Sequence, residues 1–220
     1  LNLDLGDRLS VMAGARAEYT NYDYNNRTDD GSACAPSATA CRFYRPADRQ
    51  DSFNNWSLNA GVSYSLSDNH SSYLRLAKGF RAPQTTELYR LQSGQQVADL
   101  DSEELSNVEL GLRGNFSDKL QYDISVYLMN KDEVIFQDAD RQNVSGAKTE
   151  HYGSELSLNY FFSEAWELGL DFTLARHKYA SRIELLGANT DIKGNDIDTA
   201  PRTFGSARLG WNLQPDFDWD

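Results

Sequence analysis

The sequence lacks any long hydrophobic run. No stretch of about 18 consecutive apolar residues occurs among its 220 residues, so no transmembrane helix is predicted. Hydrophobic residues make up 40% of the chain and the mean hydropathy is -0.64, which argues against a helical membrane protein. A transmembrane β-barrel is compatible with both values, because only every second residue of its strands faces lipid.

The chain is also poor in positive charge. It has 21 Lys and Arg residues against 33 Asp and Glu residues, a net charge of -12, and a pI of about 4.6. No basic stripe is present to displace counterions, so nucleic acid is not a predicted partner. The acidic residues are spread along the chain and form no tail, so disorder driven by charge is not predicted either.

Cysteine is scarce. The two cysteines, Cys34 and Cys41, are separated by the six residues of APSATA. This spacing favours a small disulfide loop formed in an oxidising compartment. Two free thiols remain an alternative. A metal site is the least favoured alternative, because no histidine or second cysteine pair lies nearby in the sequence.

Catalytic motifs are missing as well. The three histidines, His70, His151 and His177, lie in different segments, and the sequence contains no HExxH, GxSxG or P-loop motif. For each histidine we favour a surface or rim position over catalysis. The segment GNDIDT at 194–199 has too few oxygen ligands at the spacing of a calcium loop. The sequence therefore predicts no enzyme, no cofactor and no metal site.

Alternating apolar and polar residues are the dominant pattern that is present. They predict eight strands, at 8–24, 53–66, 70–81, 104–116, 120–137, 149–162, 166–180 and 200–213. In the third segment, for example, Leu74 and Leu76 share one face and Arg75 lies on the other. Each segment offers about 9–11 alternating residues, the length of a tilted membrane strand, whereas soluble strands average about 5–6. The fold class is predicted as all-β, an antiparallel transmembrane β-barrel.

The predicted connections alternate between short and long. The short ones are 67–69, 117–119 and 163–165, and the long ones are 25–51, 81–103, 138–148 and 181–199. This alternation is typical of outer-membrane barrels. The opening LNLDLGDRLSV is typical of strand, turn and strand, without an initial methionine or leader. We interpret 1–220 as one partial barrel domain, an internal piece of a longer protein.

Two stretches resemble a known family. LRLAKGFRAPQTTELY at 74–89 and LDSEELSNVELGLRG at 100–114 resemble consecutive strands of TonB-dependent outer-membrane receptors. Weaker resemblances are GDRLSVMAGARAEY, EHYGSELSLNY and GNDIDTAPRTFGSARLGW, in the order expected for the later part of the barrel. The resemblance implies a barrel of about 22 strands around an N-terminal plug, of which this chain holds about eight strands and no plug.

The same resemblance implies the function. Such receptors lie in the bacterial outer membrane and import scarce ligands, chiefly ferric siderophores and other iron complexes. The implied partners are outer-membrane lipid, the small ligand, and TonB, which contacts an N-terminal region absent from this chain. The resemblance therefore implies a receptor and transporter fragment with no catalytic residues.

Ligand-binding candidates come from two predicted loops, because binding residues concentrate in loops on a rigid scaffold. The first loop supplies Arg42, Tyr44, Arg45 and Arg49, and the second supplies Arg81, Tyr89 and Arg90. Cations combined with aromatic rings suit an anionic, aromatic ligand such as a ferric catecholate. The alternative is a solvated loop closed by its disulfide. Aspartates in the same loops exclude a uniformly positive funnel.

Two other classes of protein remain open at this level. A self-contained eight-stranded outer-membrane barrel with an adhesive or structural role predicts that the first and eighth strands pair. A secreted, soluble β-sandwich acting as a binding module predicts two packed sheets and a solvated charged face.

Overall fold

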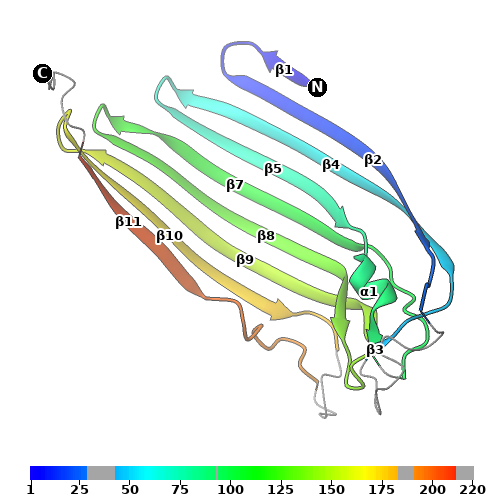
Figure 1. Cartoon of the computed structure of the whole chain (residues 1–220). Helices are drawn as coiled ribbons and strands as arrows, with labels where there is room; N and C mark the ends of the chain where they lie inside the picture. Colours follow the sequence, from blue (N-terminus) through cyan, green and yellow to red (C-terminus); the bar gives the residue numbers. More distant parts are fainter. Residues whose placement is uncertain (29–42, 93, 183–190, 212–220) are drawn as a thin grey trace, which may run out of the picture.

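One antiparallel sheet dominates the molecule (Figure 1). The computed structural model describes residues 1–28, 43–92, 94–182 and 191–211. The nine strands of the sheet are β1 (Asn2–Leu5), β2 (Leu9–Tyr24), β4 (Arg49–Ser67), β5 (His70–Arg81), β7 (Glu103–Ser117), β8 (Leu120–Gln137), β9 (Asn143–Phe161), β10 (Trp166–Tyr179) and β11 (Thr203–Trp211), and they lie side by side in this order. The strands β3 (Phe43–Tyr44) and β6 (Leu91–Gln92) form a second, two-stranded sheet, and the helix is α1 (Thr85–Tyr89).

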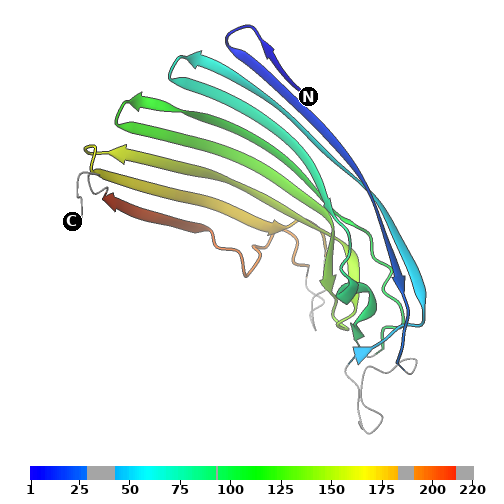
Figure 2. The same ribbon diagram turned by 45° about the horizontal axis from the view of Figure 1, so that its top comes forward.

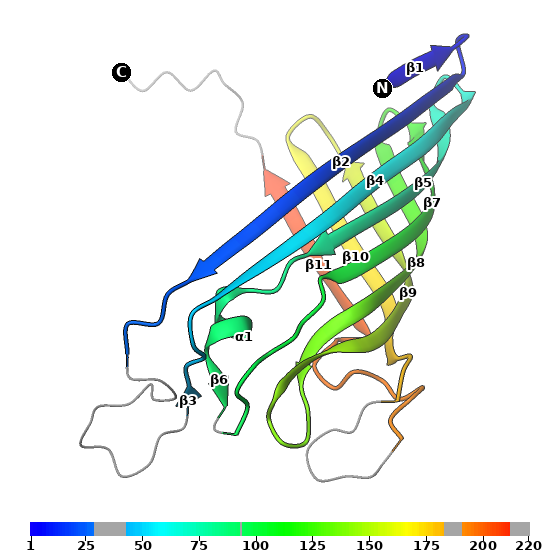
Figure 3. The same ribbon diagram turned by 90° about the vertical axis from the view of Figure 1, so that its right-hand side faces the viewer.

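The large sheet is curved like part of a barrel wall (Figures 2 and 3). Each strand pairs with the next one in the sheet order, and β1 and β11 form the two edges in the described part of the chain. The first and last long strands do not pair, contrary to what a self-contained eight-stranded barrel predicts. In the described residues the strands also do not form two packed sheets of sandwich type. The fold is that of an open piece of barrel wall.

The two faces of the sheet differ as the alternation predicted. Leu74, Leu110 and Val126 are directly opposite one another on β5, β7 and β8, and 36–54% of each remains exposed. We call this row and its apolar neighbours the apolar belt. Arg75 and Glu109 are paired in the same register but alternate to the polar face. The belt is exposed because, among the residues that the structure describes, no second layer covers it.

A polar row marks one limit of the apolar belt. On the apolar face the register aligns Lys78, Ser106, Asn130, Glu150 and Lys178, one from each strand from β5 to β10. Beyond this row lies the end of the sheet that carries the longer connections, which we call the loop end. The opposite end carries the tight turns and is the turn end.

Serine side chains shape the turn end. Ser67, Ser117 and Ser163 each accept a hydrogen bond through Oγ from the backbone N–H two residues later, at 3.2–3.4 Å. This interaction lets a short polar side chain stand in for a backbone partner in a tight turn. It explains why the Ser-containing triplets in the sequence mark these turns.

One predicted long loop is much shorter than expected. Residues 138–148 were predicted as a connection, but β8 continues to Gln137 and β9 begins at Asn143. The remaining turn is held by Asp138 Oδ1, which accepts hydrogen bonds from the N–H groups of Asp140 at 2.9 Å and Gln142 at 2.8 Å. The prediction was wrong because the pairing of these strand ends is irregular. The register shifts between Lys131 and Val134 and again between Val134 and Phe136, so their apolar residues do not continue the regular alternation of the apolar belt.

The other difference concerns residues 82–102, which we call the inserted loop. It was predicted as an extended connection, yet it contains α1 and β6 and folds into the concavity of the sheet at the loop end (Figure 3). Leu88, Leu91, Ala98 and Leu100 are buried there, with 0–6% exposure. Around them pack the partly buried Tyr22, Tyr24, Tyr44, Phe53 and Ile135. Among the described residues, these side chains form the hydrophobic core of the protein.

None of the described helices has the length and apolar character needed to cross a membrane.

Candidate functional site

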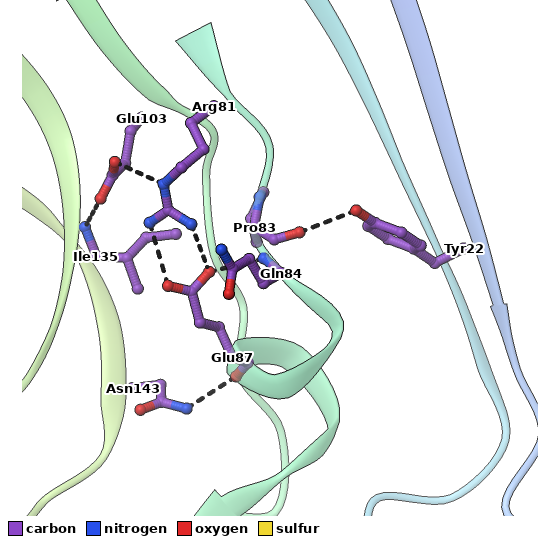
Figure 4. Close-up of polar contacts among 8 residues, drawn as sticks. All are labelled: Tyr22, Arg81, Pro83, Gln84, Glu87, Glu103, Ile135 and Asn143. Atoms are coloured by element: carbon purple, nitrogen blue, oxygen red, sulfur yellow. Dashed lines mark hydrogen bonds and ion pairs between the residues drawn. The ribbon is translucent and has the colours of Figure 1, made fainter.

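A guanidinium held by two carboxylates lies where β5 ends. Arg81 Nε donates to Glu103 Oε2 at 2.8 Å, while Nη1 and Nη2 donate to the two carboxylate oxygens of Glu87 at 2.9 and 3.1 Å (Figure 4). Glu103 begins β7 directly opposite Arg81 in the register, and Glu87 belongs to α1. These contacts tie the two ends of the inserted loop to the helix inside it.

Glu87 also caps the first turn of α1. Its Oε2 accepts a hydrogen bond from the backbone N–H of Gln84 at 2.7 Å, and the Gln84 side chain bonds back to the helix in a capping box. A helix of five residues is too short to be stable alone. Its position therefore depends on this cap, on Arg81 and on the core beneath it.

The Arg81 cluster lies three residues beyond Lys78, outside the apolar belt. The hydrogen bonds that Arg81 donates to Glu103 and Glu87 raise the pKa of Arg81. Burial acts to raise the pKa of Glu103, but hydrogen bonds from Arg81 and from the backbone N–H of Ile135, at 2.9 Å, outweigh it and hold that pKa below its ordinary value. Both groups are charged at neutral pH.

This shift predicts an acid-sensitive inserted loop. Because the pKa of Glu103 is lower in the folded protein, its contribution to stability is complete well above the ordinary pKa of 4.5 and is lost as the pH falls through the folded pKa. Glu103→Gln is expected to weaken hydrogen-exchange protection of the inserted loop at pH 7, with the difference from the unsubstituted protein vanishing in acid. Rates are normalised to the intrinsic exchange rate at each pH. A difference that persists unchanged in acid would contradict the assignment.

Tyrosines pack on the other side of α1. Tyr89 is 4% exposed; its ring stacks on Tyr24 at a centroid distance of 4.2 Å, and its hydroxyl donates to Asp51 Oδ2 at 2.8 Å. Burial and this hydrogen bond raise the pKa of Tyr89. Tyr22 donates through its hydroxyl to the carbonyl of Pro83 at 3.1 Å (Figure 4). The helix is thereby attached to β2 and β4.

An amide pair attaches the inserted loop to β9. Gln95 Nε2 donates to the Asn143 carbonyl at 2.8 Å, and Gln95 Oε1 accepts from the Asn143 N–H at 2.9 Å. The Asn143 side chain donates in turn to the carbonyl of Glu87 at 2.9 Å (Figure 4). Gln95 and Asn143 are 5% and 8% exposed. The side chain of Gln95 thus satisfies buried backbone groups as a neighbouring strand would.

Beside the helix lies a pocket of about 550 Å³. Its walls include the aromatic rings of Tyr24 and Phe43 and the cationic side chains of Arg45 and Arg90. Arg45 Nη1 donates to the carbonyl of Tyr89 at 3.2 Å, and the guanidinium of Arg90 lies 4.0 Å from the centre of the Phe43 ring. This arrangement of guanidinium groups and rings can accept an anionic, planar ligand.

The family model for the β-barrel of TonB-dependent receptor-like proteins matches residues 1–220. The chain belongs to this receptor family. No curated protein sequence matches it.

Solved structures of receptors share the fold. The ferric-catecholate import receptor Fiu of E. coli K12 has a TM-score of 0.71 at 16% identity, covering 98% of this chain and 31% of its own. The ferric yersiniabactin uptake receptor FyuA of Yersinia pestis has a TM-score of 0.68 at 15% identity, and the match covers 98% of this chain and 30% of FyuA. The copper transporter OprC has a TM-score of 0.71 at 17% identity, and the match covers 97% of this chain and 32% of OprC. The present chain therefore spans about a third of the length of these similar proteins.

The structure brings several of the predicted ligand residues of this receptor chain together. Arg45, Tyr89 and Arg90 border the pocket. Tyr44 pairs with Leu91 between β3 and β6.

The other predicted residues lie elsewhere. Arg49 forms an ion pair with Asp51, which also accepts the hydrogen bond of the Tyr89 hydroxyl. Arg81 donates three hydrogen bonds to the carboxylates of Glu103 and Glu87. Arg42 and the predicted disulfide between Cys34 and Cys41 lie outside the described residues.

Sequence reasoning missed part of the pocket. Tyr22, Asp23 and Tyr24 line it from the end of β2, and none was predicted as a site residue. A signal was available: Tyr22 and Tyr24 are two positions apart on the polar face, continuing beyond the apolar belt. Large aromatic rings on that face need a partner, and the inserted loop supplies it.

Within the described part of the chain, no group of three or more His, Cys, Asp and Glu residues is arranged to hold a metal ion.

Proposed function

We propose that this chain is part of the barrel wall of an outer-membrane receptor that imports a ferric siderophore or similar iron complex. The observation that carries this proposal is the pocket between α1 and β2, where Arg45 and Arg90 lie beside aromatic rings. Ferric catecholates are anionic and carry aromatic rings, so guanidinium groups and ring stacking complement both features. Membership of the TonB-dependent receptor family supports this class of ligand, and Fiu and FyuA are named for ferric ligands.

The bacterial outer membrane is the proposed location. The apolar belt exposes large side chains on neighbouring strands, including Leu110 at 54% and Val126 at 50%. A soluble monomer rarely leaves such a continuous apolar surface in water, whereas lipid would cover it at little cost. The polar row from Lys78 to Lys178 then lies at the edge of the hydrocarbon layer, where long cationic side chains reach the headgroups.

The proposed mechanism divides the work between parts of a longer protein. The loop end captures the ligand, the barrel wall frames a plug, and TonB supplies energy through an N-terminal region that this chain does not contain. The polar face of the sheet, with Arg75, Glu109 and their neighbours, would face that plug. The domain boundaries 1–220 are proposed as one section of the barrel domain.

Reading the complete gene tests this domain organisation. We expect a plug domain before the first strand and further barrel strands beyond 220, because the similar receptors are about three times longer. A reading frame that begins and ends close to this chain would overturn the proposal.

The ligand is tested by binding. In the complete receptor, Arg45→Gln and Arg90→Gln are each expected to weaken binding of a ferric catecholate about 10- to 100-fold, because a hydrogen bond to a charged group contributes about 1.5–3 kcal/mol. Isothermal titration in detergent measures the change. Arg202→Gln is the matched control, because Arg202 pairs with Asp196 away from the pocket. Equal affinity in all variants would remove the pocket from ligand binding.

A further inference from the structure

Two histidines meet on the polar face near the loop end. His151 on β9 and His177 on β10 are directly opposite in the register. Their Nδ1 atoms are 2.8 Å apart and their ring centres 5.0 Å apart. In the sequence they are 26 positions apart and belong to separate strands, so only strand pairing brings them together. Neither histidine lines the pocket beside α1.

The same row continues with a thioether. Met129 on β8 is directly opposite His151 in the register and lies on the same face of the sheet. Side chains directly opposite on neighbouring strands have Cβ atoms about 4.5–5.5 Å apart. Three adjacent strands therefore place two imidazoles and one methionine sulfur in a single row.

The hydrogen bond between the rings defines their protonation. Two Nδ1 atoms at 2.8 Å share one proton, so at least one ring presents an Nδ1 lone pair. His151 Nε2 is also hydrogen-bonded to Thr149 Oγ1 at 2.8 Å, and Thr149 is only 7% exposed. A buried partner on the second ring nitrogen is the arrangement that orients histidine ligands in metal sites.

We propose that His151 and His177 bind a late transition-metal ion, such as Zn²⁺ or Cu⁺, in place of their shared proton, with Met129 as a third ligand for Cu⁺. Metal–nitrogen bonds of about 2.0–2.1 Å in tetrahedral geometry separate two nitrogens by about 3.3 Å. The rings therefore need to part by about 0.5 Å. The displaced proton moves to the free Nε2 of one ring, so both imidazoles remain neutral and no redox step occurs.

The surroundings select the class of ion. No carboxylate takes part in this row, and Lys131 lies directly opposite Thr149 in the next row. Hard cations such as Mg²⁺ and Ca²⁺ require oxygen ligands, whereas imidazole and thioether favour zinc and copper. The nearby ammonium group disfavours a dication more than a monocation, so the site is expected to prefer Cu⁺. This inference is independent of the iron-complex proposal, because it uses neither α1 nor the pocket.

The test is a metal titration of the complete receptor in detergent, with Zn²⁺ and with Cu⁺ kept reduced. His151→Gln and His177→Gln are each expected to weaken binding at this site by more than about 100-fold, since loss of even an outer partner costs about 10- to 100-fold. His70→Gln is the matched control, because His70 bonds to the Tyr122 hydroxyl at the turn end, at 2.9 Å. The metal affinity of the His70→Gln variant is expected to equal that of the unsubstituted receptor.

Two further variants separate ligand from support. Met129→Leu is expected to lower the affinity for Cu⁺ and leave that for Zn²⁺ within a few-fold. Thr149→Val keeps the shape of the side chain but removes its hydroxyl. This variant is expected to bind both Zn²⁺ and Cu⁺ about 10- to 100-fold more weakly.

A spectroscopic measurement on the unsubstituted receptor avoids dependence on folded variants. With ¹⁵N-labelled histidine, Zn²⁺ is expected to shift the ring signals of His151 and His177 and not those of His70. Absence of any shift, or metal binding that survives the double substitution His151→Gln and His177→Gln, would overturn the site.

Discussion

Replacing Arg81 with glutamine is expected to loosen the inserted loop more than any other single change of a charged residue. The substitution removes the guanidinium that joins Glu103 and Glu87 and leaves two carboxylates facing each other. Charge-assisted hydrogen bonds contribute about 1.5–3 kcal/mol each, but the Arg81 side chain is 37% exposed, so solvent screens part of this energy. We expect a local loss of about 2 kcal/mol, or roughly 30-fold faster hydrogen exchange in the inserted loop.

Arg16→Gln is the matched control for this experiment. Arg16 also pairs with a glutamate, Glu18, but its side chain is 70% exposed, and exposed pairs contribute little. Exchange in the inserted loop should not change in this variant. If Arg81→Gln leaves that exchange unaltered as well, the cluster does not hold the loop.

The second large effect is expected from Leu91→Ala. Leu91 is 0% exposed and packs in the small core with Leu88 and Leu100. Truncating a fully buried leucine costs about 2–5 kcal/mol, because transfer energy is lost and a cavity remains. The inserted loop should then become sensitive to limited proteolysis. The ligand binding that we propose for the pocket beside α1 should be lost with it, because α1 forms one wall of that pocket.

A leucine of the apolar belt provides the comparison. Leu110 is 54% exposed on the sheet and touches no part of the inserted loop's core. Leu110→Ala should leave the proteolysis pattern of that loop unchanged. Equal sensitivity in both variants would mean that the loop is released by any weakening of the sheet, and not by loss of its own core.

The alternation in the sequence predicted the strands well where the apolar belt runs. Leu74 and Leu76 on one face and Arg75 on the other were sufficient to place β5, since a period of two assigns each side chain to a face without any knowledge of its neighbours. The serine turns were also predicted from local sequence, because the side chains of Ser67 and its counterparts accept hydrogen bonds from backbone N–H groups only two residues later.

The strand ends were harder to predict. Asn143 and the residues after it extend β9 through backbone pairing with β8, across register shifts between Lys131 and Phe136 that interrupt the regular alternation. The helix α1 was missed because five residues are too few to show a helical period, and its stability comes from Arg81 and the buried leucines.

The residues of the candidate site were only partly predicted, and their role in ligand binding stays a prediction. Arg45, Tyr89 and Arg90 were recognised as cations and rings in loops, and they do border one pocket. Tyr22 and Tyr24 were missed because they belong to a strand. Two rings on the polar face indicate that some segment packs on them, but nothing local identifies that segment as a loop some 60 residues later.

By itself, the sequence determined the strands, the face to which each side chain belongs, the positions of the tight turns and the receptor family. These properties depend on residues close together in the chain. The tertiary structure alone decided that the inserted loop folds into the concave side of the sheet, that Arg81 serves two carboxylates, and that His151 meets His177. These contacts depend on register and on burial between distant segments, and no local pattern encodes which partners will share them.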